Sequence, residues 1–218
     1  MEILLIPGLW LDGSAWDDVL PELTARGHHP VPLTLPGDTL DDHLDAVLAA
    51  LTGPALVVGH SAASTLAWLA ADARPDLVAG AVFVGGFPAH DGRAYADFFP
   101  VADGVVPFPG WEPFDGPDSA DLDQAARDRF TAAAIPVPAG VTGGVVRLRD
   151  ERRFDVPVTV VCPEFSPDEA REWIAAGDVP ELAKAKNVRF ADLDSGHWPM
   201  FTRPAELAAL LAEAAHPA

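Results

Sequence analysis

The sequence predicts a single α/β domain (residues 1–218) built on a mainly parallel sheet of about six strands. Short runs that are apolar throughout alternate with longer segments whose apolar residues recur at helical spacing. Strands that lack a polar face are typical of a parallel sheet covered by helices on both faces. The length of 218 residues and the hydrophobic content of 49 % fit one domain with a sizeable core.

The strands and helices are expected in regular order along the chain. Strands are predicted at residues 3–6, 31–33, 55–58, 79–84, 156–161 and 188–191. Helices are predicted from residue 16 to 27 and from 40 to 53, and the last helix is expected to begin at Pro204. Ser14 and Asp17 have the spacing of a capping box. The expected order of the strands within the sheet is 2-1-3-4-5-6.

Residues 88–153 interrupt this alternation and are expected to form a small cap insertion within the domain. The segment has no clear strand pattern and is rich in proline and aromatic residues. A loop of this length inside a compact domain is usually functional or a subdomain of its own. Residues 121–134 show its best helical pattern. A disordered proline-rich insert is the alternative, and the many aromatic residues disfavour it.

Composition narrows the class of partner. The formal net charge of -19 and the pI near 4.4 argue against nucleic acid or anionic membranes as partners and fit neutral substrates, and a solubilising surface is the preferred interpretation of this charge. The expected partner is a small-molecule ester substrate. The single Cys162 excludes an intramolecular disulfide and a cysteine-based metal cluster. Neither a secretory signal pattern nor an apolar stretch of membrane-spanning length is recognised, so a cytoplasmic location is expected. The oligomeric state is left open, a homodimer included.

Residues Gly59-His60-Ser61-Ala62-Ala63 carry the most specific functional pattern. They follow the apolar run at 55–58 and precede a helical segment, which is the strand–turn–helix context of a nucleophile elbow. Small flanking residues are needed there because the turn brings strand and helix close together, and Ala63 replaces the usual second glycine. The alternative is that Ser61 simply caps the following helix.

A serine hydroxyl needs a general base to act as a nucleophile. His197 follows the last predicted strand, which places it at the carboxyl edge of the sheet, and the chain order of serine before histidine fits an elbow enzyme. His60 is expected to point away from the tip of the turn, while His43 and His90 stay open as alternatives. His28, His29 and His216 are expected far from the elbow.

A tetrahedral intermediate needs two backbone N–H groups aimed at its negatively charged oxygen. The residue after the nucleophile, Ala62, is expected to supply one of them. The turn after the first strand, at residues 7–10, is expected to supply the other through Leu9. A plain turn is the alternative for this segment.

Taken together, these motifs resemble the α/β-hydrolases, and within them the small esterases related to plant methylesterases and hydroxynitrile lyases. The resemblance covers nearly the whole chain and depends on motifs in the right order, namely Gly8 with Trp16, Gly59-His60-Ser61, Asp150–Phe154 before a strand ending in Cys162, and Gly196–Phe201. It implies an α/β-hydrolase fold, Ser61 as nucleophile, His197 as base, and the amides of Leu9 and Ala62 as the oxyanion hole. It implies no cofactor and no metal.

The chain departs from this group at the triad acid. The group places an aspartate shortly after the cysteine of the fifth strand, and Phe165 stands at that position here. Glu164 is the nearest carboxylate and is long enough to reach His197 from a shifted turn. Asp91 is the second candidate and Asp168 the third. A site without any acid is the remaining alternative.

The predicted function is a serine hydrolase that cleaves small carboxylic esters through an acyl-enzyme intermediate. The lyases of the group carry a threonine where Gly8 stands and a lysine near the acid, whereas this chain has no lysine between Met1 and Ala183. A lyase, cyclase or acyl-transfer reaction in the same site is the first alternative, and a decayed ligand-binding protein is the second. Five aromatic residues are expected to line an apolar substrate pocket or to pack the cap, namely Trp10, Phe87, Trp111, Phe114 and Trp198.

Overall fold

The computed structural model describes residues 1–216, whose core is a six-stranded, fully parallel sheet in the order β2-β1-β3-β4-β7-β8. In chain order the strands are β1 (Glu2–Ile6), β2 (His29–Pro32), β3 (Ala55–His60), β4 (Val78–Val84), β7 (Val158–Cys162) and β8 (Val188–Asp192). The predicted fold class and strand order are confirmed. The strand order changes direction between β1 and β3, because β2 lies on one side of β1 and the later strands lie on the other. In open α/β sheets, ligands bind in the crevice at such a point, beyond the carboxyl ends of the strands.

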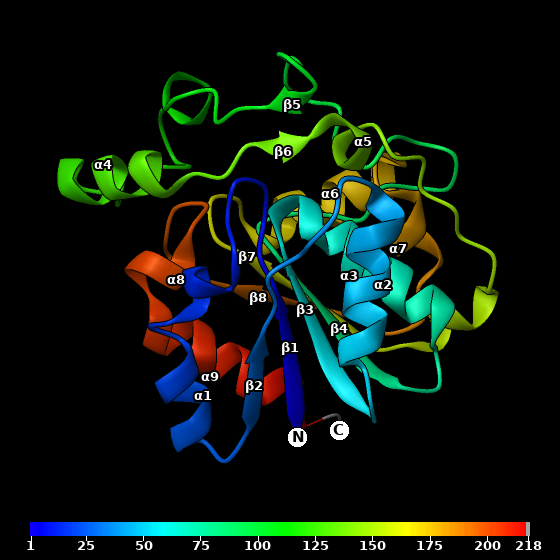
Figure 1. Cartoon of the computed structure of the whole chain (residues 1–218). Coiled ribbons are helices and arrows are strands. Elements are labelled where there is room, and N and C mark those ends of the chain that lie inside the picture. The colour runs from blue at the N-terminus through cyan, green and yellow to red at the C-terminus, as the bar shows by residue number, and fades with distance from the viewer. Residues whose placement is uncertain (217–218) are drawn as a thin grey trace.

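Helices cover both faces of this sheet (Figure 1). The helices α2 (Leu40–Ala50) and α3 (Ser64–Ala73) pack together on one side, and α1 (Leu20–Ala25) and α9 (Pro204–Ala214) pack together on the other. The shorter helices α6 (Pro167–Ala176), α7 (Pro180–Lys184) and α8 (Pro199–Thr202) complete the part of the chain that follows β7.

The central strands are buried because both of their faces meet helices. Every residue of β3 is buried, and Ile3, Leu4, Leu5 and Ile6 of β1 are completely inaccessible. Burying a side chain of this size contributes about 1.5–3 kcal/mol, so these two strands anchor the core. The strand β2 contains prolines, which have no N–H group to donate to a neighbouring strand. It lies at the edge of the sheet, so the hydrogen bonding between the central strands is not interrupted.

Some helices and strands begin or end at other residues than the sequence predicts. The expected capping box at Ser14 and Asp17 is wrong, because Asp12 is the capping residue and its Oδ1 accepts from the Ser14 amide at 2.9 Å. The turn that follows is a 3₁₀ helix, η1 (Gly13–Trp16), and α1 begins only at Leu20. The strand β3 is two residues longer than predicted and runs as far as His60, which places the elbow at its very end.

Most of the chain between β4 and β7 lies over the carboxyl ends of the strands, and its last part runs down beside α3 to the start of β7 (Figure 1). Its elements are β5 (Val105–Val106), η3 (Glu112–Phe114), α4 (Gln124–Ala133), β6 (Val137–Pro138), α5 (Ala139–Thr142) and η4 (Glu151–Asp155). The pairing of β5 with β6 is antiparallel and was not predicted, because each strand has only two residues and β6 contains a proline. The predicted helix at 121–134 is present as α4, which begins three residues later because Asp123 caps it.

Two contacts fasten this overlying segment, which we call the cap, to the core. An aromatic cluster joins them at one end, with Trp10 of the core 5.1–6.0 Å from the rings of Phe99, Phe108 and Phe114. At the other end, the buried Arg153 bonds to Asp72 and Glu181 at 3.2 and 3.0 Å. Together they fix the position of the cap over the sheet edge.

Candidate active site

Ser61 is held in a strained turn at the end of β3. Its φ of +55° lies in the left-handed region, which is uncommon for a residue other than glycine and costs of the order of 1–3 kcal/mol. A side chain at Gly59 would overlap the carbonyl group of Ala63, so the chain can turn this tightly only with glycine there. Strand β3 leads into this turn and α3 leads out of it, as the elbow motif predicts.

The alternative that Ser61 merely caps a helix does not fit the structure. The turn continues as η2 (Ser61–Ala63), and the residue at the N-cap position of α3 is Ala63. No side-chain capping bond is formed at either position. Ser61 is thus a half-buried residue at the end of β3 that does not cap the helix after it.

His197 lies on the loop after β8 and is bound to Glu164. Its Nδ1 lies 2.6 Å from Oε1 of Glu164, and both side chains are largely buried. A carboxylate can only accept this bond, so Nδ1 carries a hydrogen, and in the neutral ring the lone pair is then on the other nitrogen, Nε2. This is the tautomer that a general base requires.

The main chain of His197 is fixed from two further sides. Its amide donates to the carbonyl oxygen of Asp118 in the cap at 2.7 Å. Its carbonyl oxygen accepts a bond from Nε2 of His60 at 2.7 Å, and the two imidazole rings lie 5.0 Å apart. The histidine is therefore held by the cap, by the end of β3 and by the loop after β7.

His60 itself is a buried, neutral residue. Burial, with a smaller effect of the neighbouring His197, lowers the pKa of His60 to about 3. Its Nδ1 has no hydrogen-bond partner among residues 1–216, and it faces Gly8, where an added Cβ would lie only 2.6 Å away. His60 thus spans the space between the turn after β1 and His197, and Gly8 has to be small for the ring to fit.

Two consecutive glycines lie against the Ser61 main chain and the His197–Glu164 pair, which places both beside the turn after β4. Gly85 and Gly86 follow β4 directly. A Cβ at Gly86 would lie 2.5 Å from the carbonyl oxygen of Ser61, and one at Gly85 would lie 3.2 Å from Nδ1 of His197 and 3.3 Å from Oε2 of Glu164. Sequence reasoning missed both glycines, although a glycine pair directly after a buried strand was available to suggest a close approach.

The other two candidate acids are engaged elsewhere. Asp91 accepts a bond from the Leu148 amide at 2.8 Å, and Asp168 forms an exposed ion pair with Arg171. Phe165, which stands where the related esterases carry the acid, packs against Phe87 with ring centroids 5.4 Å apart. The structure therefore brings Glu164 to His197, and neither Asp91 nor Asp168.

A second carboxylate, that of Asp118, lies near the pair. Burial raises the pKa of the Asp118 carboxyl, Glu164 raises it further, and His197 opposes both effects. The neighbouring Asp121 accepts a bond from the Gly196 amide at 2.8 Å. Both residues belong to the cap, so the loop that carries His197 rests on the cap segment 118–121.

The turn after β1 is tightly folded. Trp10 has a φ of +64°, and its Nε1 donates to the carbonyl oxygen of Val106 at 3.2 Å. Leu9 and Ala62, whose amides are the expected oxyanion donors, are both buried. The turn is thus fixed by the His60 ring on one side and by the cap on the other.

The five aromatic residues proposed for a substrate pocket fall into two groups. Trp10, Trp111, Phe114 and Trp198 belong to the aromatic cluster between cap and core, in which Trp198 lies 5.4 Å from Trp111 and 5.2 Å from Phe114. Phe87 lies in a separate group with Phe165 and Trp173. Much of their surface is thus used in contacts with one another.

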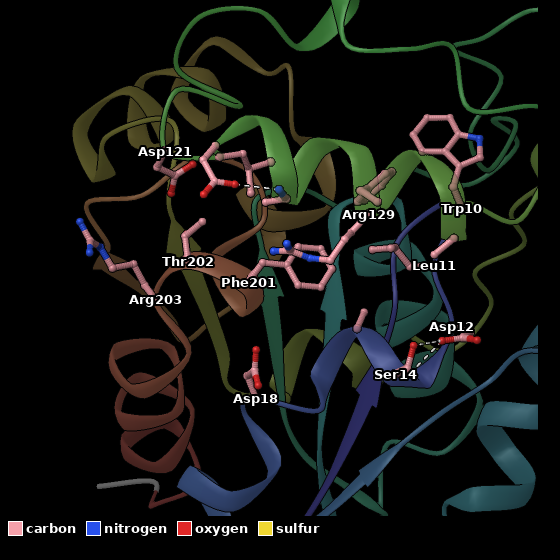
Figure 2. Close-up of a pocket in the computed structure, with 16 residues that line it drawn as sticks. Trp10, Leu11, Asp12, Ser14, Asp18, Asp121, Arg129, Phe201, Thr202 and Arg203 are labelled. Carbon is pink, nitrogen blue, oxygen red and sulfur yellow. Dashed lines mark hydrogen bonds between the residues drawn. The ribbon is translucent and has the colours of Figure 1, made fainter.

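Two cavities are lined in part by the turn after β1. The larger, about 580 Å³, lies between α4 and the core, with Arg129, Phe201 and Asp121 among its walls (Figure 2). The smaller, about 210 Å³, lies beside the turn after β1. Trp10, Leu11 and Asp12 line both cavities, so this segment lies between the two spaces.

The sequence matches the alpha/beta hydrolase family over residues 3–210. The chain is an α/β-hydrolase. No curated protein sequence matches it.

Solved structures show how closely the fold of this hydrolase follows that of small esterases. An extracellular alpha/beta-hydrolase from a Paenibacillus species, described as homologous in structure and function to tobacco salicylic acid binding protein 2, has a TM-score of 0.78, with 18 % identity and full coverage of both chains.

Two further structures extend the comparison. A methylesterase from Arabidopsis superimposes with a TM-score of 0.78 at 16 % identity and covers 98 % of each chain. A pyrethroid hydrolase from Sphingobium faniae gives 0.71 at 20 % identity, covering 98 % of this chain and 96 % of its own. The expected resemblance to the plant methylesterase group is confirmed at the level of the fold.

Residues 1–216 contain neither a membrane-spanning helix nor a cluster of metal ligands. Within residues 1–216, every helix is too short or too polar to cross a bilayer. In the same part of the chain, no three histidine, cysteine or acidic side chains are grouped as metal ligands would be.

Proposed function

We propose that this α/β-hydrolase cleaves small carboxylic esters, with Ser61 as nucleophile, His197 as general base and Glu164 as the acid of the triad. The observation that carries the proposal is the 2.6 Å bond from His197 to Glu164 at the sheet edge where the strained Ser61 is presented. A histidine fixed in this tautomer next to an elbow serine is the arrangement that acyl transfer requires.

The reaction has two halves. In the first, His197 removes the proton of Ser61 while the Oγ attacks the ester carbonyl carbon, and the amides of Leu9 and Ala62 stabilise the oxyanion. The alcohol then leaves with the proton held by His197, and the acyl group stays on Ser61. In the second half, His197 activates a water molecule that releases the carboxylic acid and restores the serine.

The reach of glutamate explains why the triad acid occurs one residue early. Glu164 precedes the position of the usual aspartate, and its side chain is one methylene longer. That extra length lets Oε1 meet Nδ1 while Phe165 packs against Phe87. In this position Glu164 orients the ring and stabilises the imidazolium that forms when Ser61 loses its proton.

The turn after β1 favours hydrolysis over a lyase reaction. It carries Gly8 in place of the threonine of the related lyases, and the chain has no lysine before Lys184 to act beside the acid.

The chemistry needs no cofactor and no metal ion. With a net charge of -19, the protein is suited to neutral esters rather than to nucleic acid or anionic membranes, and we place it in the cytoplasm.

Hydrolysis of 4-nitrophenyl acetate by wild type, Ser61→Ala and His197→Ala tests the proposal. We expect turnover by the wild type and a loss of at least about 10³-fold in each variant. His29→Ala, which changes an exposed histidine far from the elbow, is the matched control and is expected to behave as wild type. Equal turnover by Ser61→Ala would contradict the proposal and favour a reaction without an acyl-enzyme. Absence of turnover in folded wild type would favour a ligand-binding protein.

A further inference from the structure

The larger cavity, of about 580 Å³, lies between α4 of the cap and the core. Helix α4 forms one wall, the turn after β1 and η1 form a second, and α8 forms a third (Figure 2). Its volume falls within the range of about 300–1,000 Å³ that is usual for small-molecule sites. Neither the proposed triad of Ser61, His197 and Glu164 nor Ala62 lines it. The cavity is therefore a candidate site for a ligand other than the substrate.

Two residues in the wall of this cavity contact the chain neighbours of His197. Asp121 accepts a hydrogen bond from the amide of Gly196 at 2.8 Å. The ring of Phe130 lies 5.4 Å from that of Trp198, which in turn lies 4.9 Å from the ring of His197. A molecule bound in the cavity would therefore touch the supports on both sides of the proposed base without entering the triad.

The wall of the cavity is acidic and aromatic. Its charged side chains are four carboxylates and two guanidinium groups, from Asp12, Asp18, Asp121, Asp123, Arg129 and Arg203. A cleft in which one sign of charge dominates concentrates ligands of the opposite sign, and the net charge of -19 acts in the same direction. Trp10, Phe130 and Phe201 add aromatic rings, whose faces attract cations. The cavity thus favours an organic cation.

One hydroxyl group in the wall lacks a partner. Oγ1 of Thr202 is buried and makes no hydrogen bond within residues 1–216. Buried hydroxyl groups almost always have a hydrogen-bond partner. An ammonium group carries N–H donors, and a hydroxyl oxygen can accept from them, so Thr202 suits the same class of ligand as the carboxylates do.

We infer that the cavity between α4 and the core is an effector site that binds a small organic cation with an apolar body. The cation competes with the Gly196 amide for the carboxylate of Asp121, and it thereby loosens the loop that carries His197. The apolar body packs against the rings of the wall. Binding is independent of the proposed function, whereas the effect on hydrolysis rests on it.

Isothermal titration calorimetry with benzyltrimethylammonium and 2-phenylethylammonium tests binding, with phenylacetate as the anionic comparison. We expect both cations to bind the wild type and phenylacetate to bind at least about tenfold more weakly. Ala126→Phe places a ring in the cavity from the half-buried side of α4 and should weaken cation binding by about tenfold or more. Ala133→Phe, at the exposed end of α4, is the second variant in case Ala126→Phe fails to fold.

Charge variants test the sign of the ligand. Asp18→Asn removes a carboxylate from the wall and should weaken cation binding by about threefold or more, whereas Arg129→Ala removes a like charge and should strengthen it by about twofold or more. Asp17→Asn is the matched control, because this exposed neighbour lies outside the wall, and its affinity should equal that of the wild type. Absence of cation binding by the folded wild type, full binding by folded Ala126→Phe and Ala133→Phe, or the reverse signs in the charge variants would overturn the inference.

Steady-state hydrolysis of 4-nitrophenyl acetate tests the effect on His197. Saturating benzyltrimethylammonium should lower kcat of the wild type by about twofold to tenfold with KM unchanged. It should leave kcat of Asp121→Ala unchanged, because that variant lacks the carboxylate for which the cation competes. An unchanged kcat of the wild type, a rise in KM alone, or an equal loss in Asp121→Ala would overturn the effector role. A wild type that binds the cations but hydrolyses no ester with or without them would instead refute the proposed function, so the two failures are distinguishable.

Discussion

His197 is restrained at three of its atoms by three separate segments. Glu164 binds the ring at Nδ1, Asp118 accepts from the amide, and His60 donates to the carbonyl oxygen. Such restraint reduces the cost of reaching the reactive geometry, because the ring has little freedom left to lose. Each contact can be removed separately, which makes its contribution measurable.

Replacing the triad acid tests its assignment. Glu164→Gln keeps the shape of the side chain but removes the charge that stabilises the imidazolium, so kcat should fall by up to about 10⁴-fold. Asp91→Asn is the matched control: an asparagine can still accept from the Leu148 amide, and turnover should be unchanged. Steady-state kinetics on an aryl ester measure both. A large loss in Asp91→Asn with a normal Glu164→Gln would reverse the assignment.

His60 predicts a pH dependence of stability. Its pKa falls from the ordinary value of 6.5 to about 3 on folding, so below pH 6.5 the unfolded chain binds a proton that the folded protein does not. The free energy of unfolding should therefore decrease as pH falls from 6.5 toward 3, by at most about 1.4 kcal/mol per pH unit from this residue.

Urea unfolding at pH 7 and pH 5 measures this effect. His60→Asn removes the titrating group, so the difference in stability between the two pH values should be smaller in the variant than in the wild type. His28 and His43, whose pKa values are also lowered by burial, contribute equally to both proteins and cancel in the comparison. An identical pH dependence would show that His60 is protonated or accessible.

At the scale of elements, the cap supports the loop that carries His197. Asp121 accepts from the Gly196 amide, and a Cβ at Gly196 would overlap both Asp118 and Asp121. The two segments are thus packed against each other with glycine at the contact. The cap segment 118–121 is therefore part of the site's framework, whatever the rest of the cap does.

Removing the Asp121 acceptor should loosen this loop. We expect Asp121→Ala to lower kcat by roughly tenfold or less with little change in KM, because the bond is partly exposed and the loop keeps its contact with Asp118. Asp121→Asn retains an acceptor oxygen and should restore most of the activity. If the alanine and asparagine variants lose the same activity, the hydrogen bond is not what positions His197.

The buried Arg153 should be more important for stability than its exposed neighbour Arg152. Arg153→Met leaves Asp72 and Glu181 buried without their cation, which should cost about 3–5 kcal/mol of unfolding free energy. Arg152→Met breaks only exposed pairs with Asp76 and Asp150, which solvent screens, so it should change the unfolding free energy far less. Denaturant unfolding of both variants gives the comparison, and equal losses would refute it.

At the scale of the whole molecule, the sequence predicted the features that depend on burial. Strands β1, β3 and β4 were predictable because nearly every residue in them is apolar and meets helices on both faces. The elbow was predictable because only small residues fit between β3 and α3. These are local consequences of composition, and the structure agrees with them.

Features set by distant contacts could not be predicted in the same way. Strands β5 and β6 are held in place by the cap, and the left-handed conformation of Trp10 follows from contacts with Val106 and the aromatic cluster. The choice among Glu164, Asp91 and Asp168 depends on where each loop ends relative to His197. The sequence gives the reach of a side chain but not the position of the loop that carries it.

The most direct test of the central claim is covalent labelling of Ser61. Incubation with a small fluorophosphonate, followed by mass spectrometry of the intact protein and its peptides, should show one adduct per chain, located on Ser61. The adduct should be absent in Ser61→Ala and form far more slowly in His197→Ala, because the base is what activates the hydroxyl. A folded wild-type protein that stays unlabelled, or one labelled equally fast without His197, would contradict the account.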